Sequence, residues 1–181
     1  MPEETVPSAR RNVELKATDP WPVRSLDTCR SLGAEAMGPI WQRDSYFDVA
    51  FGGLKLREEH PGRPHLIQFE RPSEPQQRES RYRVIEVDNA VVTLEALMAA
   101  IGLTIVVTKR RQLFVWEGVR IHLDTVEQLG TFIELEAVAP PESDLAHEHG
   151  LIGRLRDAFE ITDDRLLATG YAAQLRDATS R

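Results

Sequence analysis

Charged and apolar side chains alternate along two widely separated segments of this sequence, Asn12–Lys16 and Phe132–Val138. Successive side chains of a β-strand point to opposite faces, so each segment would place all its ionisable groups on one face. If those faces point inward, three carboxylates and Lys16 become buried, which costs free energy unless another charged group lies between them. A divalent cation that holds a polyphosphate would satisfy both signs of charge, and the pattern therefore predicts a ligand of this kind.

Short alternating segments, separated by turn residues such as Gly52-Gly53 and Pro61-Gly62, continue through much of the chain. They predict strands at 11–18, 40–49, 53–60, 64–71, 79–87, 103–109 with 110–117, 118–126 and 130–139. Helices are expected at 23–32 after a cap in Asp19–Pro22, at 94–101 with Thr93 as cap and Gly102 as stop, at 143–159 and at 163–167, with a last turn near 172–176. Residues 1–10 are expected to form a disordered tail, and 11–178 a single domain.

The polar faces of these strands favour a closed barrel over an open sheet. An open antiparallel sheet usually has one face in solvent, which is the alternative reading of the alternation. Here, however, arginines and carboxylates cluster strand by strand, and a barrel with a charged interior explains that clustering better. The expected fold is α+β, an eight-stranded, mostly antiparallel, tunnel-like barrel with helices packed outside. The polar faces comprise Gln42, Asp44, Tyr46 and Asp48; Lys55, Arg57 and Glu59; Gln68 and Glu70; Arg81 and Arg83; Lys109 and Arg111; and Arg120, His122 and Asp124. The opposite faces carry apolar residues, among them Ile67 and Phe69.

Composition excludes several classes of protein. The net charge of −7 argues against broad nucleic-acid affinity, whereas a local basic cavity would suit a small anionic ligand. No apolar run is long enough to span a membrane, and the N-terminal segment has no apolar core typical of a secretory signal. The single cysteine, Cys29, cannot form an intramolecular disulfide or a multi-cysteine metal site, so we expect a cytoplasmic protein.

Several of these segments resemble the strand motifs of one family. Asn12-Val-Glu14-Leu-Lys16 resembles the ExExK strand of the CYTH domain, the triphosphate tunnel superfamily of class IV adenylate cyclases and thiamine or inorganic triphosphatases. The other motifs follow in the family's order, and the closest likeness is to the adenylate cyclase-like branch. They are Gln42–Phe47, Leu54–Glu58, Leu66–Pro72, Lys109–Arg111, Arg120–Asp124, Leu129–Glu136 and the isolated Tyr171.

The resemblance implies a role for each matching residue. Mg²⁺ or Mn²⁺ would bind Glu14, Glu134 and Glu136, with Asp124 as a fourth ligand, and a small-molecule triphosphate would lie among basic side chains. Catalysis would depend on Glu14, Lys16, Glu134 and Glu136. The substrate-binding residues would be Lys16, Lys55, Arg57, Arg83, Lys109, Arg111, Arg120 and Tyr171. No nucleic acid or membrane is expected as a partner, and a homodimer is left open.

Two departures from the family's motifs leave the reaction open. Asn12 stands where the first acid of ExExK is expected, and Glu70 stands where many relatives have a phosphate-binding lysine. The function that the resemblance favours is cyclisation of ATP to cyclic AMP and pyrophosphate. The alternatives are hydrolysis of an inorganic, thiamine or nucleoside triphosphate, and non-catalytic binding of a phosphorylated metabolite. His122 could be a general base or a hydrogen-bonded residue of the interior.

Overall fold

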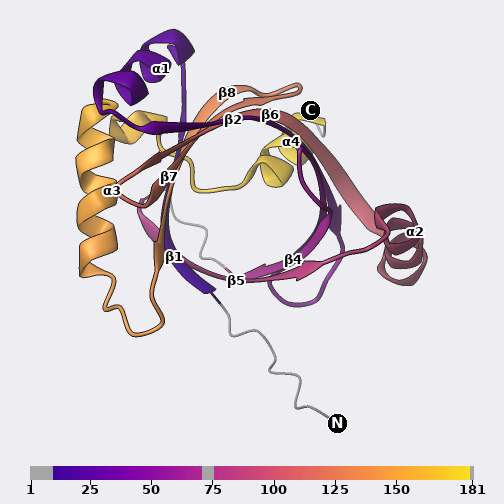
Figure 1. The fold of residues 1–181 in the computed structure, drawn as a ribbon. Helices are drawn as coiled ribbons and strands as arrows, with labels where there is room; N and C mark the ends of the chain where they lie inside the picture. Colours follow the sequence, from indigo (N-terminus) through magenta and orange to yellow (C-terminus); the bar gives the residue numbers. More distant parts are fainter. Residues whose placement is uncertain (1–9, 71–75, 180–181) are drawn as a thin grey trace.

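Eight antiparallel strands close into a barrel, in the order β1-β5-β4-β3-β2-β6-β7-β8 (Figure 1). The computed structural model describes residues 10–70 and 76–179. The strands are β1 (Arg10–Thr18), β2 (Glu35–Phe47), β3 (Gly53–His60), β4 (His65–Glu70), β5 (Arg78–Glu86), β6 (Leu103–Trp116), β7 (Val119–Val126) and β8 (Gly130–Ala139). The helices are α1 (Pro22–Ser31), α2 (Ala90–Ile101), α3 (Ala146–Ala158) and α4 (Tyr171–Thr179), with a 3-10 turn at Asp163–Arg165. The predicted α+β barrel is confirmed.

The main apolar core lies outside the barrel, between its wall and two helices. The odd-numbered apolar residues of β1, β7 and β8, such as Leu15, Ile121 and Ile133, are almost fully buried beneath α1 and α3. Because side chains alternate along a strand, the even-numbered residues of the same strands point into the barrel. This packing fixes which polar residues face the interior.

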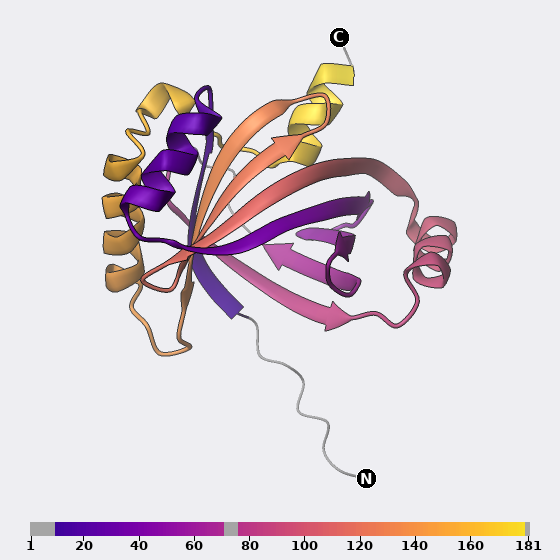
Figure 2. The same ribbon diagram turned by 45° about the horizontal axis from the view of Figure 1, so that its top comes forward.

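The remaining helices lie away from this core. Helix α2 stands on the opposite side of the barrel from α1 and α3 (Figure 2), and none of its residues is buried. Helix α4 covers one end of the barrel, where Tyr171 and Leu175 pack against Val107, Val126 and Phe132. These apolar contacts hold α4 against β6, β7 and β8. Among the described residues, no helix has the length and apolar character needed to cross a membrane.

Several expected boundaries were wrong. Helix α2 begins four residues earlier than predicted because Asn89, and not Thr93, caps it by accepting a hydrogen bond from Val92 N at 3.1 Å. Strand β2 starts at Glu35, and its register shifts between Ala36 and Gly38. The expected long helix at 143–159 is shortened at its N-terminal end, and 163–167 forms only a 3-10 turn.

The outer limits of the chain are tested only in part. The expected disordered tail, apart from Arg10 in β1, lies outside the described residues, as does Arg71, the expected end of a strand. The assignment of 11–178 to a single domain stays a prediction.

Asp19 does take part in the start of α1, since its Oδ1 accepts hydrogen bonds from Trp21 N at 3.3 Å and from Ser25 Oγ at 2.8 Å.

Candidate functional site

The barrel encloses a cavity of about 330 Å³, lined by side chains from all eight strands and by Tyr171 of α4. This volume lies within the range of small-molecule sites. Seven lysine and arginine side chains and five aspartate and glutamate side chains line it. The cavity is therefore biased toward positive charge within a protein whose net charge is −7, as a site for a small anion would require.

One wall of the cavity carries the predicted carboxylates. In the pairing of β1 with β8, Glu14 lies opposite Glu136 and Lys16 lies opposite Glu134. Glu134 forms an ion pair with Lys16 Nζ at 3.1 Å and accepts a hydrogen bond from Arg111 Nη2 at 2.9 Å. Burial by itself would raise the pKa of Glu134, but the Lys16 charge and the other donors outweigh it and hold this pKa well below the ordinary range.

The other two carboxylates of this wall also have partners. Arg78 Nε donates to Glu14 at 2.8 Å. Glu136 accepts hydrogen bonds from Asn12 Nδ2 at 2.5 Å and from Arg120 Nη1 at 3.3 Å. All three predicted metal ligands are therefore ionisable groups already engaged by donors from neighbouring strands.

The side chains of this wall carry the kinds of oxygen atoms that bind a hard metal ion, but these atoms are not grouped into a metal site in this structure. Within residues 10–70 and 76–179, no three acidic, histidine or cysteine side chains are grouped so that they could hold a metal. Asn12 Oδ1, however, is buried without a hydrogen-bond partner and adds a neutral oxygen beside Glu14 and Glu136. Carboxylate and amide oxygens are what Mg²⁺ and Mn²⁺ prefer. Binding would require the carboxylates to exchange their present donors for the ion.

Asp124, predicted as a fourth metal ligand, does not line the cavity. Arg111 binds both its oxygens at 2.7 Å, while Lys109 Nζ at 3.1 Å and Tyr171 Oη at 2.9 Å donate to Oδ2. Burial opposes the charge, yet Arg111 and Lys109 hold the pKa of Asp124 far below its ordinary range. Asp124 therefore lies behind the cavity wall and positions Lys109 and Arg111, which line the cavity.

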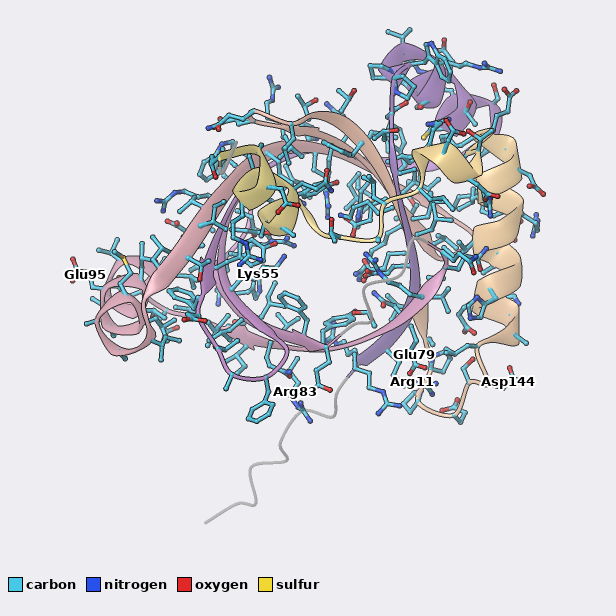
Figure 3. All side chains as sticks on the ribbon, turned by 180° about the vertical axis from the view of Figure 1, so that it is seen from behind. Arg11, Lys55, Glu79, Arg83, Glu95 and Asp144 are labelled. Carbon is cyan, nitrogen blue, oxygen red and sulfur yellow. The ribbon has the colours of Figure 1, made fainter. Side chains whose placement is uncertain are left out.

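A second ion cluster lies on β2 and β3. Asp44 is buried and accepts two hydrogen bonds from Arg57, both at 2.7 Å, and one from Lys55 at 2.8 Å. Burial alone would raise the pKa of Asp44, but the charges of Arg57 and Lys55 keep it well below the ordinary range. Asp44 thus holds these two side chains in place while both still line the cavity, where Lys55 is labelled in Figure 3.

The pKa of Lys109, a basic residue of this cavity, lies far below that of an ordinary lysine. Burial, and to a lesser extent the nearby Arg111 guanidinium, lower the pKa of Lys109 to about 7 against the opposing effect of Asp124. The side chain is 3% exposed. Near neutral pH, Lys109 is therefore divided between its charged and neutral forms.

The sequence of residues 10–149 matches the CYTH domain family. The chain belongs to this family. None of the curated proteins compared with it matches. Solved structures share the fold: the PH1012 protein of Pyrococcus horikoshii has a TM-score of 0.80 at 19% identity, over 90% of this chain and 98% of that one.

Two other solved structures have functional descriptions. A candidate adenylate cyclase of Vibrio parahaemolyticus has a TM-score of 0.78 at 20% identity, over 93% of this chain and 99% of that one. HpAC1 of Hippeastrum, a candidate adenylyl cyclase described as having a dominant triphosphatase activity, has a TM-score of 0.67 at 17% identity, over 93% and 96%. At these identities the likeness concerns the fold.

On β4 and β5 of this CYTH barrel, three features lie on the opposite face from the one that the sequence predicted. Arg83, predicted to bind substrate, lies on the outer face, is exposed and donates to Gln68 at 3.1 Å (Figure 3). Glu70 is also exposed and does not line the cavity, so it does not alter the interior. The apolar residues Ile67 and Phe69, expected outside, line the cavity instead.

The other predicted residues face the interior of the CYTH barrel. Glu14, Lys16, Lys55, Arg57, Lys109, Arg111, Arg120, Glu134, Glu136 and Tyr171 all line the cavity. Lys16 Nζ lies 3.7 Å from the centre of the Tyr171 ring, an arrangement that orients the ammonium group. His122 also lines the cavity, and its Nδ1 lies 3.5 Å from Glu134 Oε2.

Sequence reasoning missed Arg78, which is 3% exposed and links three parts of the CYTH fold. From β5 it donates to Glu14 of β1 and to the carbonyl oxygen of Ala168, just before α4. Arginines occur on both faces of β5, at Arg78 and at Arg81, so charge alone could not identify the inward face. The available signal was the polar and aromatic pattern Ser80-x-Tyr82, which continues inward from Arg78.

Proposed function

We propose that this protein is a metal-dependent enzyme that acts on a triphosphate inside the barrel. The observation that carries the proposal is a single cavity with a carboxylate wall on β1 and β8 and basic side chains on the strands around it. Phosphoryl chemistry depends mainly on positioning and charge neutralisation, and this cavity supplies groups for both. Membership of the CYTH family supports the same class of substrate.

Each group would act on a different part of the substrate. Lys16, Arg57 and Arg111 would bind phosphate oxygens, since each already lines the cavity and is held by a buried or half-buried carboxylate. Glu14, Glu134 and Glu136, with Asn12 Oδ1, would hold Mg²⁺ or Mn²⁺. The bound ion would supply positive charge that stabilises the phosphate oxygens of the transition state.

The first candidate reaction is cyclisation of ATP, in which the ribose 3′-oxygen attacks the α-phosphorus and pyrophosphate leaves. The second is hydrolysis, in which water attacks the terminal phosphorus. The dominant triphosphatase activity described for HpAC1, which has the same fold, supports this second candidate. A non-catalytic binding module has less support than these two reactions, because Glu70, a departure from the family's motifs that favoured it, lies outside the cavity. Cyclic AMP or orthophosphate as the product distinguishes the two reactions.

We expect Arg57→Ala to weaken triphosphate binding about tenfold or more, because it removes a charge-assisted contact worth about 1.5–3 kcal/mol. Arg83→Ala is the matched control, since it removes the same side chain from the outer face of the barrel. Calorimetric titration with a non-hydrolysable ATP analogue measures both variants. Equal losses of affinity in the two variants would contradict binding inside the barrel.

Triphosphate affinity should fall as the pH rises from about 7 to about 9. The pKa of Lys109 is about 7, so raising the pH removes its charge from the free protein. Binding would then require a proton to be taken up, which weakens affinity by at most about tenfold per pH unit. Titrations above pH 7.5 avoid ionisation of the ligand's terminal phosphate. In Lys109→Arg the charge persists, so a pH dependence as steep as in the wild type would show that Lys109 is not responsible.

A further inference from the structure

Helix α2 is almost entirely apolar although it lies on the surface of the molecule. Of its twelve residues only Thr93 and Glu95 have polar side chains, and none of the twelve is buried. A surface helix normally turns apolar residues toward the protein and polar residues toward water, and a helix that is apolar on all sides is normally buried. The composition of α2 therefore indicates a second contact surface besides the barrel wall.

The two sides of α2 differ in exposure. The helix contacts β2 and β3, and its half-buried residues recur at helical spacing on one side, at Ala90, Thr93, Leu94 and Leu97. We name the exposed residues of the opposite side the outer face of α2, and they are Val91, Val92, Glu95, Ala96, Met98 and Ala99. On this face Val91 is 63%, Val92 60% and Met98 45% exposed. Large apolar side chains exposed together in this way mark an interaction site.

The surroundings of the outer face carry negative charge only. Residues 86–104 include Glu86, Asp88 and Glu95 but no lysine, arginine or histidine. Glu95 is near the middle of the helix and points away from the barrel (Figure 3). Charges across an interface are normally complementary, so a partner for this face would carry a basic side chain opposite Glu95.

A second copy of this chain fits the outer face poorly. Two copies related by two-fold symmetry bring the same residues together, so Glu95 would face the identical carboxylate. The helix is about 18 Å long and about 10 Å wide, and its outer face offers on the order of 200 Å². Each partner of a stable dimer buries about 800 Å². Charge and area together favour a single helix of another protein, bound transiently.

We propose that the outer face of α2 is a docking site for an amphipathic helix of another protein, whose apolar face carries a basic residue that pairs with Glu95. Val91, Val92 and Met98 pack against that apolar face, and Ala96 and Ala99 leave room for the side chains of the docked helix. The site lies outside the barrel and does not depend on the proposed reaction.

Two synthetic peptides of about 20 residues, long enough to form helices in water, serve as probes. Each has leucine and alanine on one face and glutamine on the other. They differ only at the centre of the apolar face, where one has lysine and the other glutamate. Fluorescence anisotropy of the labelled peptides gives both dissociation constants. We expect the lysine peptide to bind the wild-type protein at least about fivefold more tightly, because only lysine is complementary to Glu95.

Two variants of α2 test the charged and the apolar contacts separately. Glu95→Lys should reverse the preference, so that the glutamate peptide binds more tightly. Asp157→Lys, at an exposed position of α3, changes the net charge equally and should keep the wild-type preference. Val92→Gln should weaken binding of both peptides about tenfold, because it replaces an apolar contact. Val23→Gln, at a 73% exposed position of α1, is the matched control and should bind as the wild type does.

Circular dichroism establishes that each variant is folded, and sedimentation velocity of the protein alone tests a second copy as the occupant. A lysine preference that reverses in Glu95→Lys, with a loss of affinity in Val92→Gln but not in Val23→Gln, supports the proposal. A dimer that dissociates in Val92→Gln would overturn it, because a second copy would then cover the outer face. No binding of the lysine peptide, or binding that neither α2 variant changes, would also overturn it.

Discussion

Glu136→Gln is expected to lower metal-dependent turnover at least about 100-fold, because it removes a full negative charge from the proposed ion site. Glu136 is the most suitable of the three carboxylates for this test. Its side chain is 16% exposed, and its arginine partner, Arg120, is 44% exposed. Loss of this exposed pair should cost little stability. Turnover of ATP with Mg²⁺ or Mn²⁺ is the measurement.

The control for this variant is Glu95→Gln, on helix α2 away from the barrel interior (Figure 3). It makes the same chemical change and should keep wild-type turnover. Near wild-type turnover by Glu136→Gln would show that Glu136 is not part of the ion site. Glu134→Gln is less suitable, because Glu134 has two basic partners in the cavity wall, so its loss would destabilise the fold.

Asp124→Asn is expected to have the largest effect on stability, about 3–5 kcal/mol in the free energy of unfolding. Asp124 is buried and is the counter-charge for Lys109 and Arg111, which are themselves buried. Removing one partner of a buried ion cluster leaves the others uncompensated. Urea denaturation followed by circular dichroism measures the change. Glu117→Gln, which breaks an exposed pair with Arg154, is the control and should cost about 0–1 kcal/mol.

The depressed pKa of Asp124 also predicts how stability depends on pH. A carboxylate whose folded-state pKa lies below its unfolded value contributes stability that is complete above the unfolded pKa, about 4, and is lost as the pH falls below it. The wild-type protein should therefore lose stability in acid more steeply than Asp124→Asn. Equal acid sensitivity of the two proteins, or a small loss in Asp124→Asn at neutral pH, would contradict the role assigned to Asp124.

Residue alternation was sufficient to predict the interior of β1, β7 and β8. On these strands one face is uniformly apolar, as in Val13-x-Leu15 and Ile121-x-Leu123, so the polar face could only point inward once the barrel closed. The order of the motifs then identified the family. The same reasoning predicted most of the cavity lining before any geometry was known.

The alternation of polar and apolar residues did not predict which face points inward on strands whose two faces carry similar kinds of residue. On β4 and β5, polar and apolar residues lie on the reverse of the expected faces, because none of the helices in the described part of the chain covers these strands and their outer face is in solvent. Arg83 and Glu70 were misplaced for this reason. The role of Asp124 could not be predicted either, because its distance from the cavity depends on how Arg111 and Tyr171 pack around it.

The central claim is that the barrel interior carries out metal-dependent chemistry on a triphosphate. Its most direct test is to incubate the purified protein separately with ATP, inorganic triphosphate and thiamine triphosphate, with Mg²⁺, with Mn²⁺ or with EDTA, and to resolve the products. We predict turnover of ATP only with a divalent cation, giving cyclic AMP and pyrophosphate, or orthophosphate if hydrolysis is the reaction. No product from any of the three triphosphates with either metal, or turnover that persists in EDTA, would contradict the claim.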